Sequence, residues 1–298
     1  MKITFVVNSL YHSQSAFRKN ILPQLYLTSN KDIDYLFTEK KGDSILLTRK
    51  AIESGTTLII GYGGDGTLHE ILNGYMTSGS QDKDSIIIGQ FPIGTGNDFS
   101  RNFNLSKKIA DLSRRLHSPS IRKIDIGQLT LADGTNVYFH NEVSFGFSAE
   151  VIRKMEISKG TGKKSYFKSI MQAFNSYRPT AVKIVGDNFK WEGKAFMIVV
   201  ANGKYMGGGM SLAPDASPFS GLFSITIVGE VSMWEYLTQL PYIFQSKKLK
   251  HPRVYYFEAR DLEIHSGEVT FAAESDGELI APVPKRIVCL PSRIKFLG

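Results

Sequence analysis

The chain has 298 residues, of which 42% are hydrophobic and 21% charged, and its formal net charge at pH 7 is +8. This length is sufficient for two domains with their own cores. No apolar run reaches the roughly eighteen residues that would span a bilayer, and residues 1–8 lack the long apolar core of a signal peptide. The single Cys289 cannot form an internal disulfide. We therefore expect a cytoplasmic globular protein.

Strand-like and helical runs alternate from residue 1 to about 120. Strands are expected at 3–8, 34–38, 57–61 and 85–91, and helices at about 14–27, 43–54, 67–76 and 106–117. This alternation is typical of a doubly wound parallel sheet with helices on its faces. It predicts an α/β domain over residues 1–122.

From residue 123 to 298 the rhythm changes to short strands separated by turn signals such as Asp133-Gly134. Strands are expected at 123–130, 136–143, 181–185, 195–201, 222–228, 254–258, 262–265, 268–273 and 286–290, and helices only near 165–177 and 232–245. Many short strands at this spacing predict a mostly antiparallel β-sandwich domain.

A glycine-rich run, Gly-Tyr-Gly-Gly-Asp-Gly-Thr at 61–67, joins the strand at 57–61 to the helix at 67–76. Glycines at such a turn let the backbone approach a ligand closely, and a helix start presents unpaired N–H groups to an anion. Asp65 within the run suits a divalent cation that bridges it to phosphates. The run indicates a magnesium–nucleotide site, although a glycine-rich turn also joins strand to helix in proteins without one.

A second glycine-rich run, Pro-Ile-Gly-Thr-Gly-Asn-Asp-Phe at 92–99, follows the next strand. The Thr95 hydroxyl can donate to a phosphate, and Asn97-Asp98 can start a helix as N-cap residues or contact the ligand. Because parallel strands end at one edge of a sheet, where open α/β sheets bind ligands, we expect the two runs side by side.

These two runs resemble the diacylglycerol kinase catalytic family, which includes sphingosine kinases and bacterial lipid kinases. Further blocks resemble the family in the family's order, and the resemblance covers nearly the whole chain: Ile124–Gly127, Asn141, Ala201–Gly209, Ala213–Ala216 and Asp276–Glu278.

The resemblance implies an ATP-dependent lipid kinase with magnesium as cofactor, and diacylglycerol is the first expectation for its lipid. It implies that Asp65 holds magnesium, that Glu278 is the general base, and that the second domain carries this base and the lipid site. The positions implied to contact the nucleotide are Asn8, Thr38, Gly63, Gly64, Asp65, Gly66, Thr67 and Thr95. Asp276-Gly277 also favours a simple hairpin turn.

Two segments depart from the family pattern. Asn8 is followed by neither proline nor a glycine-bearing loop, and Ser220 stands where many bacterial members have an aspartate that binds a structural magnesium. Since a hydroxyl is a weaker ligand for a hard cation than a carboxylate, we expect that structural site to be lost or weak. These departures leave open a non-catalytic lipid- or nucleotide-binding relative.

Other glycine motifs fit less well. Gly61-x-Gly63-x-x-Gly66 satisfies the dinucleotide fingerprint, but Phe91-Pro92 stands where that fingerprint requires an acid. The NAD kinase branch shares the Gly-Gly-Asp-Gly-Thr run. The Gly-Thr-Gly-Asn-Asp run and the 202–209 segment favour lipid kinases instead.

Two basic clusters suggest how a protein without a spanning segment meets a lipid. The first contains Arg153, Lys154, Lys159, Lys163, Lys164 and Lys168 beside Tyr166 and Phe167, and the second contains Lys247, Lys248, Lys250, His251 and Arg253. Basic residues near aromatic ones suit an anionic membrane surface. We expect reversible peripheral binding, mainly through the first cluster, and no nucleic-acid partner; a homodimer stays open.

Overall fold

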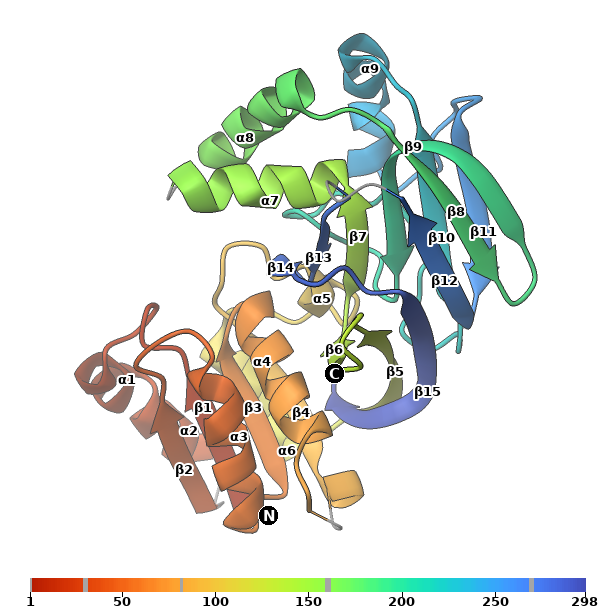
Figure 1. Ribbon diagram of the computed structural model, residues 1–298. Helices are drawn as coiled ribbons and strands as arrows, with labels where there is room; N and C mark the ends of the chain where they lie inside the picture. The colour runs from red at the N-terminus through yellow and green to blue at the C-terminus, as the bar shows by residue number, and fades with distance from the viewer. Residues whose placement is uncertain (1, 29–31, 81–82, 159–161, 268–270) are drawn as a thin grey trace. The chain divides into compact units, whose positions relative to one another are not determined.

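The computed structural model describes residues 2–28, 32–80, 83–158, 162–267 and 271–298 (Figure 1). The chain divides into two compact units. The first comprises Met1–Ile124 together with Ser292–Gly298, and the second comprises Asp125–Pro291.

The first unit is built on a parallel sheet. Its strands are β1 (Lys2–Val7), β2 (Asp32–Phe37), β3 (Leu58–Gly63) and β4 (Ile87–Pro92), in the order β2-β1-β3-β4. The end of β15 (Arg286–Leu297) adds parallel to β4, with Phe296 opposite Ile88. The predicted doubly wound parallel sheet is confirmed.

Helices connect these strands: α1 (Gln14–Asn20), α2 (Leu22–Thr28), α3 (Asp43–Glu53), α4 (Asp65–Met76), α5 (Asp98–Arg101) and α6 (Ile109–His117), with a 3₁₀ turn at Lys83–Ser85. The helix expected at 14–27 is two helices that meet at Ile21. Pro23 lies in the first turn of α2, where its missing N–H costs nothing, and it cannot continue the hydrogen-bond ladder of α1.

Aromatic rings fill the core of the first unit. Phe17 of α1 meets Tyr62 of β3 edge-on with ring centroids 5.1 Å apart, and Tyr62 stacks on Phe91 of β4 at 5.1 Å. All three side chains are buried. The apolar residues that alternate along the sequence therefore pack into one hydrophobic cluster, which includes residues near the ends of β3 and β4.

The second unit is a β-sandwich-like domain in which the long strand β9 (Lys190–Ala201) pairs with three other strands. The first half of β9 pairs with β8 (Thr180–Gly186), and the second half pairs with both β7 (Glu142–Gly146) and β10 (Phe223–Gly229). The remaining strands are β5 (Ile121–Thr130), β6 (Asn136–Phe139), β11 (Val254–Ala259), β12 (Asp261–Ser266), β13 (Ala273–Ser275) and β14 (Glu278–Ile280). Apart from the end of β15, the pairings are antiparallel, as the sequence predicts.

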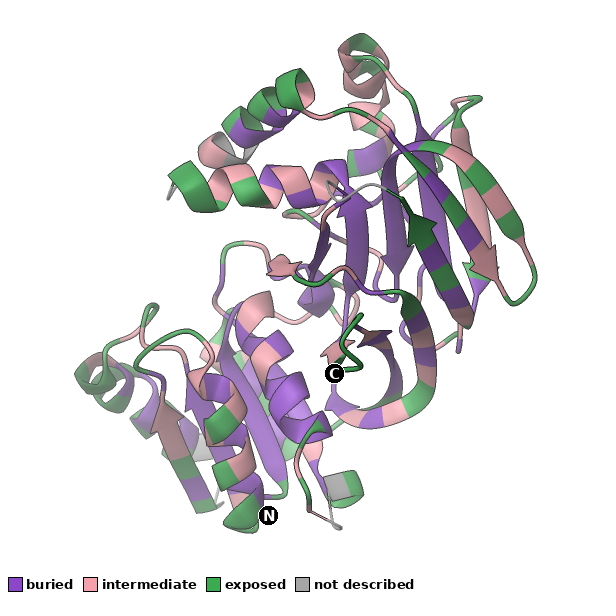
Figure 2. Cartoon of the chain, in the orientation of Figure 1, coloured by how far each residue is buried: buried purple, intermediate pink, exposed green. Residues whose placement is uncertain are grey.

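In the described part of the second unit, the helices are α7 (Phe147–Ser158), α8 (Gly162–Ser176) and α9 (Met233–Phe244). None of the helices expected from the sequence covers α7. The sequence does hold one signal for this helix, because Arg153 and Lys154 follow Glu150 by three and four residues and pair with it. Figure 2 shows α7 buried at its first turn and more exposed towards its other end.

Among the described residues, no helix is long and apolar enough to cross a membrane. The part of the expected strand 268–273 before residue 271 lies outside the described residues.

The helices α3 and α4 touch through Gly74. A Cβ on Gly74 would lie 2.6 Å from the Ile45 carbonyl oxygen and 2.8 Å from the Thr48 Cβ. The glycine therefore sets how closely the two helices pack.

We expect Gly74→Ala to destabilise the protein by about 1–3 kcal/mol, since overpacking outweighs the gain of about 1 kcal/mol in helix propensity. Urea unfolding measures the change. Gly79→Ala is the matched control, because its Cβ would meet nothing within 4 Å. Equal or greater stability of Gly74→Ala would mean that the helices shift apart freely.

Candidate active site

In the turn from β3 to α4, the Thr67 side chain packs against Gly63. A Cβ on Gly63 would lie 2.2 Å from the Thr67 hydroxyl oxygen, so only glycine fits there. Gly64 is the N-cap of α4, whose first residue is Asp65. The first N–H groups of an α-helix have no acceptor within the helix, and in α4 Gly66 and Thr67 contribute to this set. The turn thus presents donors and no side-chain bulk, as an anion requires.

The turn from β4 to α5 lies in backbone contact with the first turn. A Cβ on Gly94 would lie 2.5 Å from the Gly64 Cα, and one on Gly64 would lie 3.2 Å from the Gly94 Cα. The expected juxtaposition of the two runs at the carboxyl ends of neighbouring strands is therefore observed. Thr95, between Gly94 and Gly96, is exposed.

Asp65 ties the two turns together. Its carboxylate accepts hydrogen bonds from the backbone N–H of Asp98 at 3.0 Å and of Phe99 at 3.4 Å, the first N–H groups of α5. Asn97 occupies the N-cap position with a positive φ of 52°, but its side chain donates to the Gly94 carbonyl instead of capping the helix. Asp65, thirty-three residues earlier, therefore caps α5 in its place.

Two polar residues at the ends of β1 and β2 join this edge. Asn8 follows β1, and its side-chain amide donates to the Thr67 hydroxyl at 3.0 Å. Thr38 follows β2, is buried, and accepts a hydrogen bond from the Ser9 N–H at 3.2 Å. These contacts gather Asn8, Thr38 and Thr67 beside the glycine turns.

Two residues at this edge escaped the sequence analysis. The Tyr11 hydroxyl lies 3.5 Å from the position of a Cβ on Gly64, and partial burial together with the charge of Asp65 raises the pKa of this phenol. Lys107 donates to the Gly94 carbonyl at 2.9 Å. Neither belongs to a recognisable motif, because each reaches the turns through the tertiary fold alone.

In the second unit, Asp276 and Gly277 form the two-residue turn between β13 and β14. Both have positive φ, 51° and 86°, as a tight primed hairpin turn requires. The predicted hairpin is confirmed. Its aspartate also accepts hydrogen bonds from three consecutive backbone N–H groups, those of His140, Asn141 and Glu142.

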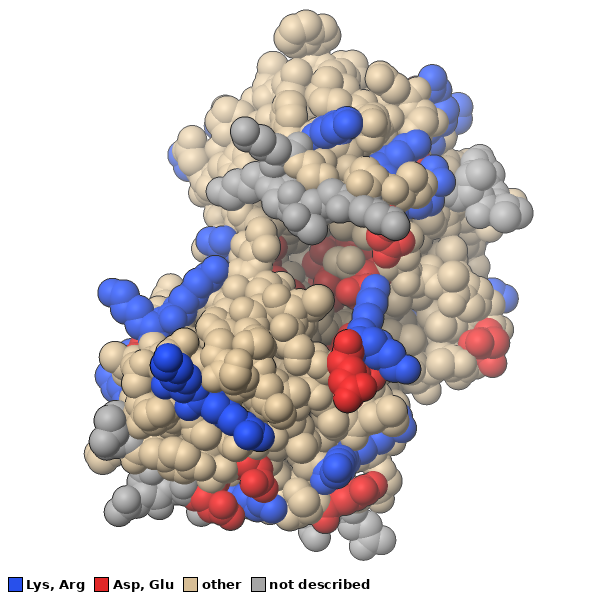
Figure 3. Space-filling view, turned by 90° about the vertical axis from the view of Figure 1, so that its left-hand side faces the viewer, with Lys and Arg blue, Asp and Glu red and all other residues tan. Residues whose placement is uncertain are grey.

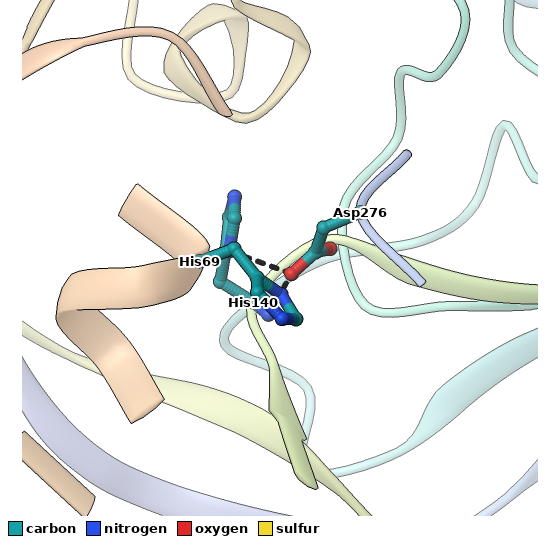
Figure 4. Close-up of side chains that lie close together, drawn as sticks. All are labelled: His69, His140 and Asp276. Atoms are coloured by element: carbon teal, nitrogen blue, oxygen red, sulfur yellow. Dashed lines mark hydrogen bonds and ion pairs between the residues drawn. The ribbon is translucent and has the colours of Figure 1, made fainter. Parts of the chain in front are cut away.

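Figure 4 shows the Asp276 carboxylate pointing at His140, whose Nδ1 lies 2.8 Å from Oδ2. Both side chains are almost completely buried. Asp276 thereby fixes the segment that leads into β7, and the hairpin cannot move without breaking these bonds.

Glu278 is the first residue of β14, directly after this turn, and it is half-buried. Its neighbour Glu274, on β13, is fully buried and shares hydrogen bonds with the Ser144 hydroxyl and the Gly277 N–H. Burial raises the pKa of the Glu274 carboxyl to about 7, while these hydrogen bonds lower it and the charge of Asp276 raises it. Glu274 therefore binds a proton more tightly than an ordinary glutamate, whereas Glu278 on the other strand of the hairpin is only half-buried.

Two asparagines connect the blocks that carry the family resemblance. The Asn202 side chain donates to the carbonyls of Asp125 and His140 at 2.9 and 2.7 Å, and Asn141 donates to the Tyr205 carbonyl at 2.8 Å. Asp276 holds Asn141 by its N–H. Four sequence blocks far apart along the chain therefore form one hydrogen-bond network in this unit.

Hydrogen bonds to other groups of the protein hold the loop at 217–222. The Ser220 hydroxyl makes contacts with the Ser217 and Leu222 carbonyls, the Asp125 carboxylate accepts from the Gly221 N–H at 2.6 Å, and the Arg260 guanidinium donates to the Gly221 carbonyl at 3.3 Å. A guanidinium beside this loop and a hydroxyl in place of a carboxylate suit a magnesium ion poorly. The residues present do not fit the structural magnesium that the family resemblance implies, in line with the expectation from Ser220.

Comparison with known families decides the identity of both units. Residues 2–129 match the family described as diacylglycerol kinase catalytic domain, and residues 141–298 match the YegS C-terminal NAD kinase beta sandwich-like domain. The chain belongs to the family of the YegS C-terminal domain, whose match covers more than half of it, and it carries a diacylglycerol kinase catalytic domain before that domain. It is accordingly a kinase, and the resemblance read from its motifs is confirmed.

Relatives match along most of the chain. A diacylglycerol kinase from Staphylococcus epidermidis is 27% identical over 283 residues, which cover 93% of this chain and 86% of the relative. One from Staphylococcus carnosus is also 27% identical, with 93% and 89% covered.

Solved structures share the fold. A diacylglycerol kinase from Bacillus anthracis has a TM-score of 0.73 at 22% identity, covering 99% of this chain and 96% of the other. Yeast NADH kinase has a TM-score of 0.56 at 12% identity, covering 100% and 83%. The two kinase branches that share the Gly-Gly-Asp-Gly-Thr run thus share the architecture.

The raised pKa of Glu274 predicts a pH-dependent stability. Because its folded-state pKa lies above the ordinary value of 4.5, the folded protein binds the proton more tightly than the unfolded chain. This contribution is complete below about pH 4.5 and is lost as the pH rises through about 7, by at most about 3 kcal/mol.

Glu274→Gln mimics the neutral acid and should flatten this slope relative to the parent. Urea unfolding between pH 5 and 8 measures it, and the difference between parent and variant isolates Glu274 from other titrating groups. Parallel pH profiles would show that Glu274 titrates normally.

Proposed function

We propose that this enzyme transfers the γ-phosphate of ATP to the hydroxyl of a lipid, most simply diacylglycerol. The single observation that carries the proposal is the backbone contact between the two glycine turns, pinned by Asp65. Glycines at the contact keep side-chain bulk away from the N–H donors at the start of α4, and phosphoryl transfer depends mainly on positioning and charge neutralisation. The names of the matched relatives support a lipid acceptor.

The geometry of Asp65 is compatible with a magnesium ion. Its carboxylate lies where the two glycine turns meet and accepts backbone N–H groups of α5, and a carboxylate is a ligand that magnesium prefers. Asp65 would hold the ion, which supplies neutralisation of phosphate charge when bound. Gly63, Gly64, Gly66, Thr67 and Thr95 would line the phosphates, with Asn8 and Thr38 alongside.

Glu278 is proposed as the general base. It would accept the proton of the lipid hydroxyl while the oxygen forms a bond to the γ-phosphorus and the bond from that phosphorus to the β–γ bridging oxygen breaks, releasing ADP. The rigid turn before Glu278, locked by the three hydrogen bonds to Asp276, supports this role because a base must be held within hydrogen-bond reach of its proton.

The experiment must also distinguish two other functions. The fold likeness to yeast NADH kinase favours a nicotinamide nucleotide as the alternative acceptor. The missing proline and glycine after Asn8 favour a non-catalytic binding protein. Incubation with radiolabelled ATP and magnesium, with diacylglycerol, mixed lipid extract or NAD(H) as acceptor, separates all three; absence of any labelled lipid would overturn the proposal.

Peripheral contact with an anionic membrane follows from a lipid acceptor and is proposed with it. In the first basic cluster, Arg153 and Lys154 both pair with Glu150, while Lys168 and Phe167 are exposed. Lys159 and the side chains of Lys163, Lys164 and Tyr166 lie outside the described residues. This cluster therefore stays a prediction from the sequence.

Glu278→Gln should lower turnover by about 10²–10⁴-fold, because the amide keeps the shape and cannot accept the proton. ATP binding should stay within a few-fold of the parent. Labelled lipid formed per unit time measures the effect, with Glu258→Gln, an exposed strand residue, as control. Near-normal turnover in folded Glu278→Gln would remove Glu278 from the chemistry.

Two substitutions at Asp65 separate ion binding from capping. Asp65→Asn keeps an acceptor for α5 but loses the charge, so magnesium–ATP should no longer raise its melting temperature, as ligand linkage requires. Asp65→Ala should lose this response and also about 1–3 kcal/mol of stability, because two backbone N–H groups lose their acceptor. If Asp65→Asn responds to magnesium–ATP like the parent, Asp65 acts only as a cap.

A further inference from the structure

Helix α9 carries apolar residues on two faces. Its inward face packs Tyr236, Leu240 and Ile243 against a core that includes Phe147 and Phe174. The Tyr236 ring lies 5.1 Å from the Phe174 ring and 6.1 Å from the Phe147 ring. A capping box between Ser232 and Glu235 fixes the start of the helix. One face therefore accounts for the anchoring of α9.

The second face is exposed. Trp234 is 79% and Phe244 is 61% exposed, and Pro241 between them is also exposed. With the half-buried Leu237, these residues recur at intervals of three and four and form one stripe. Figure 2 shows α9 mostly in the colours of intermediate and exposed residues. An amphipathic surface helix normally turns polar residues to solvent, so this stripe calls for a partner.

Lysines follow the stripe directly. Lys247, Lys248 and Lys250 are exposed, and in the part of the chain that the structure describes only Lys248 pairs with a carboxylate, that of Asp215. By contrast, on the face shown in Figure 3, basic side chains are scattered and mixed with acidic ones. The net charge of +8 alone does not mark a docking surface; lysines beside exposed aromatic residues do.

The lysine segment is held beside the helix. His251 and Arg253, just after it, contact the Glu235 carboxylate in the first turn of α9 at 3.2 and 2.5 Å. Leu249 within it is buried, and its N–H donates to the Tyr256 hydroxyl at 2.7 Å. Aromatic stripe and lysines therefore form one fixed surface.

We propose that the outward stripe of α9 and the lysines at 247–250 dock on an anionic bilayer, with Trp234 and Phe244 at headgroup level. Trp and Phe favour this interfacial depth, and cations beside them favour anionic lipid. This surface serves the proposed function by bringing the enzyme to its lipid. It assigns docking to the second basic cluster, whereas the sequence alone favoured the first.

Trp234 reports its own environment. The chain has two tryptophans, so Trp191→Phe leaves Trp234 as the only one. Phosphatidylcholine vesicles with about one third phosphatidylglycerol should shift its emission to the blue, and brominated lipids should quench it. The shift should weaken as salt rises, because the attraction is screened over about 8 Å at physiological ionic strength. Unchanged emission on vesicles that pull the protein down in sedimentation would overturn the proposal.

Substitutions then measure the contribution of each part. Trp234→Ser and Phe244→Ser should each weaken vesicle binding by about tenfold, and each lysine at 247, 248 or 250 changed to Gln by about fivefold. The matched control is Leu46→Ser with Lys50→Gln, an exposed leucine and lysine one turn apart on α3, which should bind like the parent. Equal losses in control and α9 variants would refute a specific surface.

Binding is measured without ATP on vesicles that contain no diacylglycerol, so it does not depend on the kinase reaction. If the α9 variants bind normally while the parent phosphorylates lipid, this inference fails and the function stands. If the parent phosphorylates no lipid, the function fails instead. A parent that forms dimers which Trp234→Ser dissociates, without vesicle binding, would assign the stripe to a second copy.

Discussion

The edge of the first unit's sheet at which β3 and β4 end depends on two stretches of backbone that touch. Gly64 and Gly94 lie so close that a Cβ on either would meet the Cα of the other at 3.2 or 2.5 Å. The parallel sheet brings the two turns to one edge, the absence of side chains lets them meet, and Asp65 bonds one turn to the helix that starts after the other. A carboxylate at a helix start is also electrostatically favourable. The proposed phosphate site would use the same glycines, because close packing of the turns and close approach of a phosphate both require backbone without side chains.

In the second unit, the burial of two carboxyl groups, those of Asp276 and Glu274, constrains the hairpin of β13 and β14. Asp276 is enclosed and accepts three backbone hydrogen bonds, while Glu274 beside it is enclosed with fewer and has its pKa raised to about 7 by burial. Burying a charge is costly unless donors surround it, so the burial of Glu274 favours its protonated form. The result is a stiff hairpin from which the next residue, Glu278, emerges half-buried. A loose turn would leave that carboxylate free to point anywhere.

Elsewhere in this unit, ionic groups of the protein fix the loops and surfaces. Asp125 accepts a hydrogen bond from the Gly221 N–H, and Arg260 donates to the Gly221 carbonyl, so these two side chains hold the loop at 217–222. Glu235 plays a comparable part on the surface, since it caps α9 and also holds His251 and Arg253. Backbone hydrogen bonds and the nearby His251 and Arg253 lower the pKa of its carboxyl to about 2, which keeps it charged at physiological pH. Loops that follow helices are thereby held beside them, and the surface they present is defined.

The sequence by itself determined what depends on local pattern. Periodicity gave the alternating strands and helices of the first unit and the short antiparallel strands of the second, and the Asp276-Gly277 dipeptide gave its hairpin because two positive φ angles strongly favour such residues. Pro23 was a local signal for the broken helix at 14–27, and the spacing of Glu150 from Arg153 and Lys154 was one for α7. Only the tertiary structure decided that the last strand runs on to Leu297 in the first unit. The same holds for the site: Asp65 caps a helix 33 residues away, and Glu274 meets Ser144 across 130 residues. Burial and partners of a polar side chain arise from such distant contacts, and no local pattern in one sequence records them.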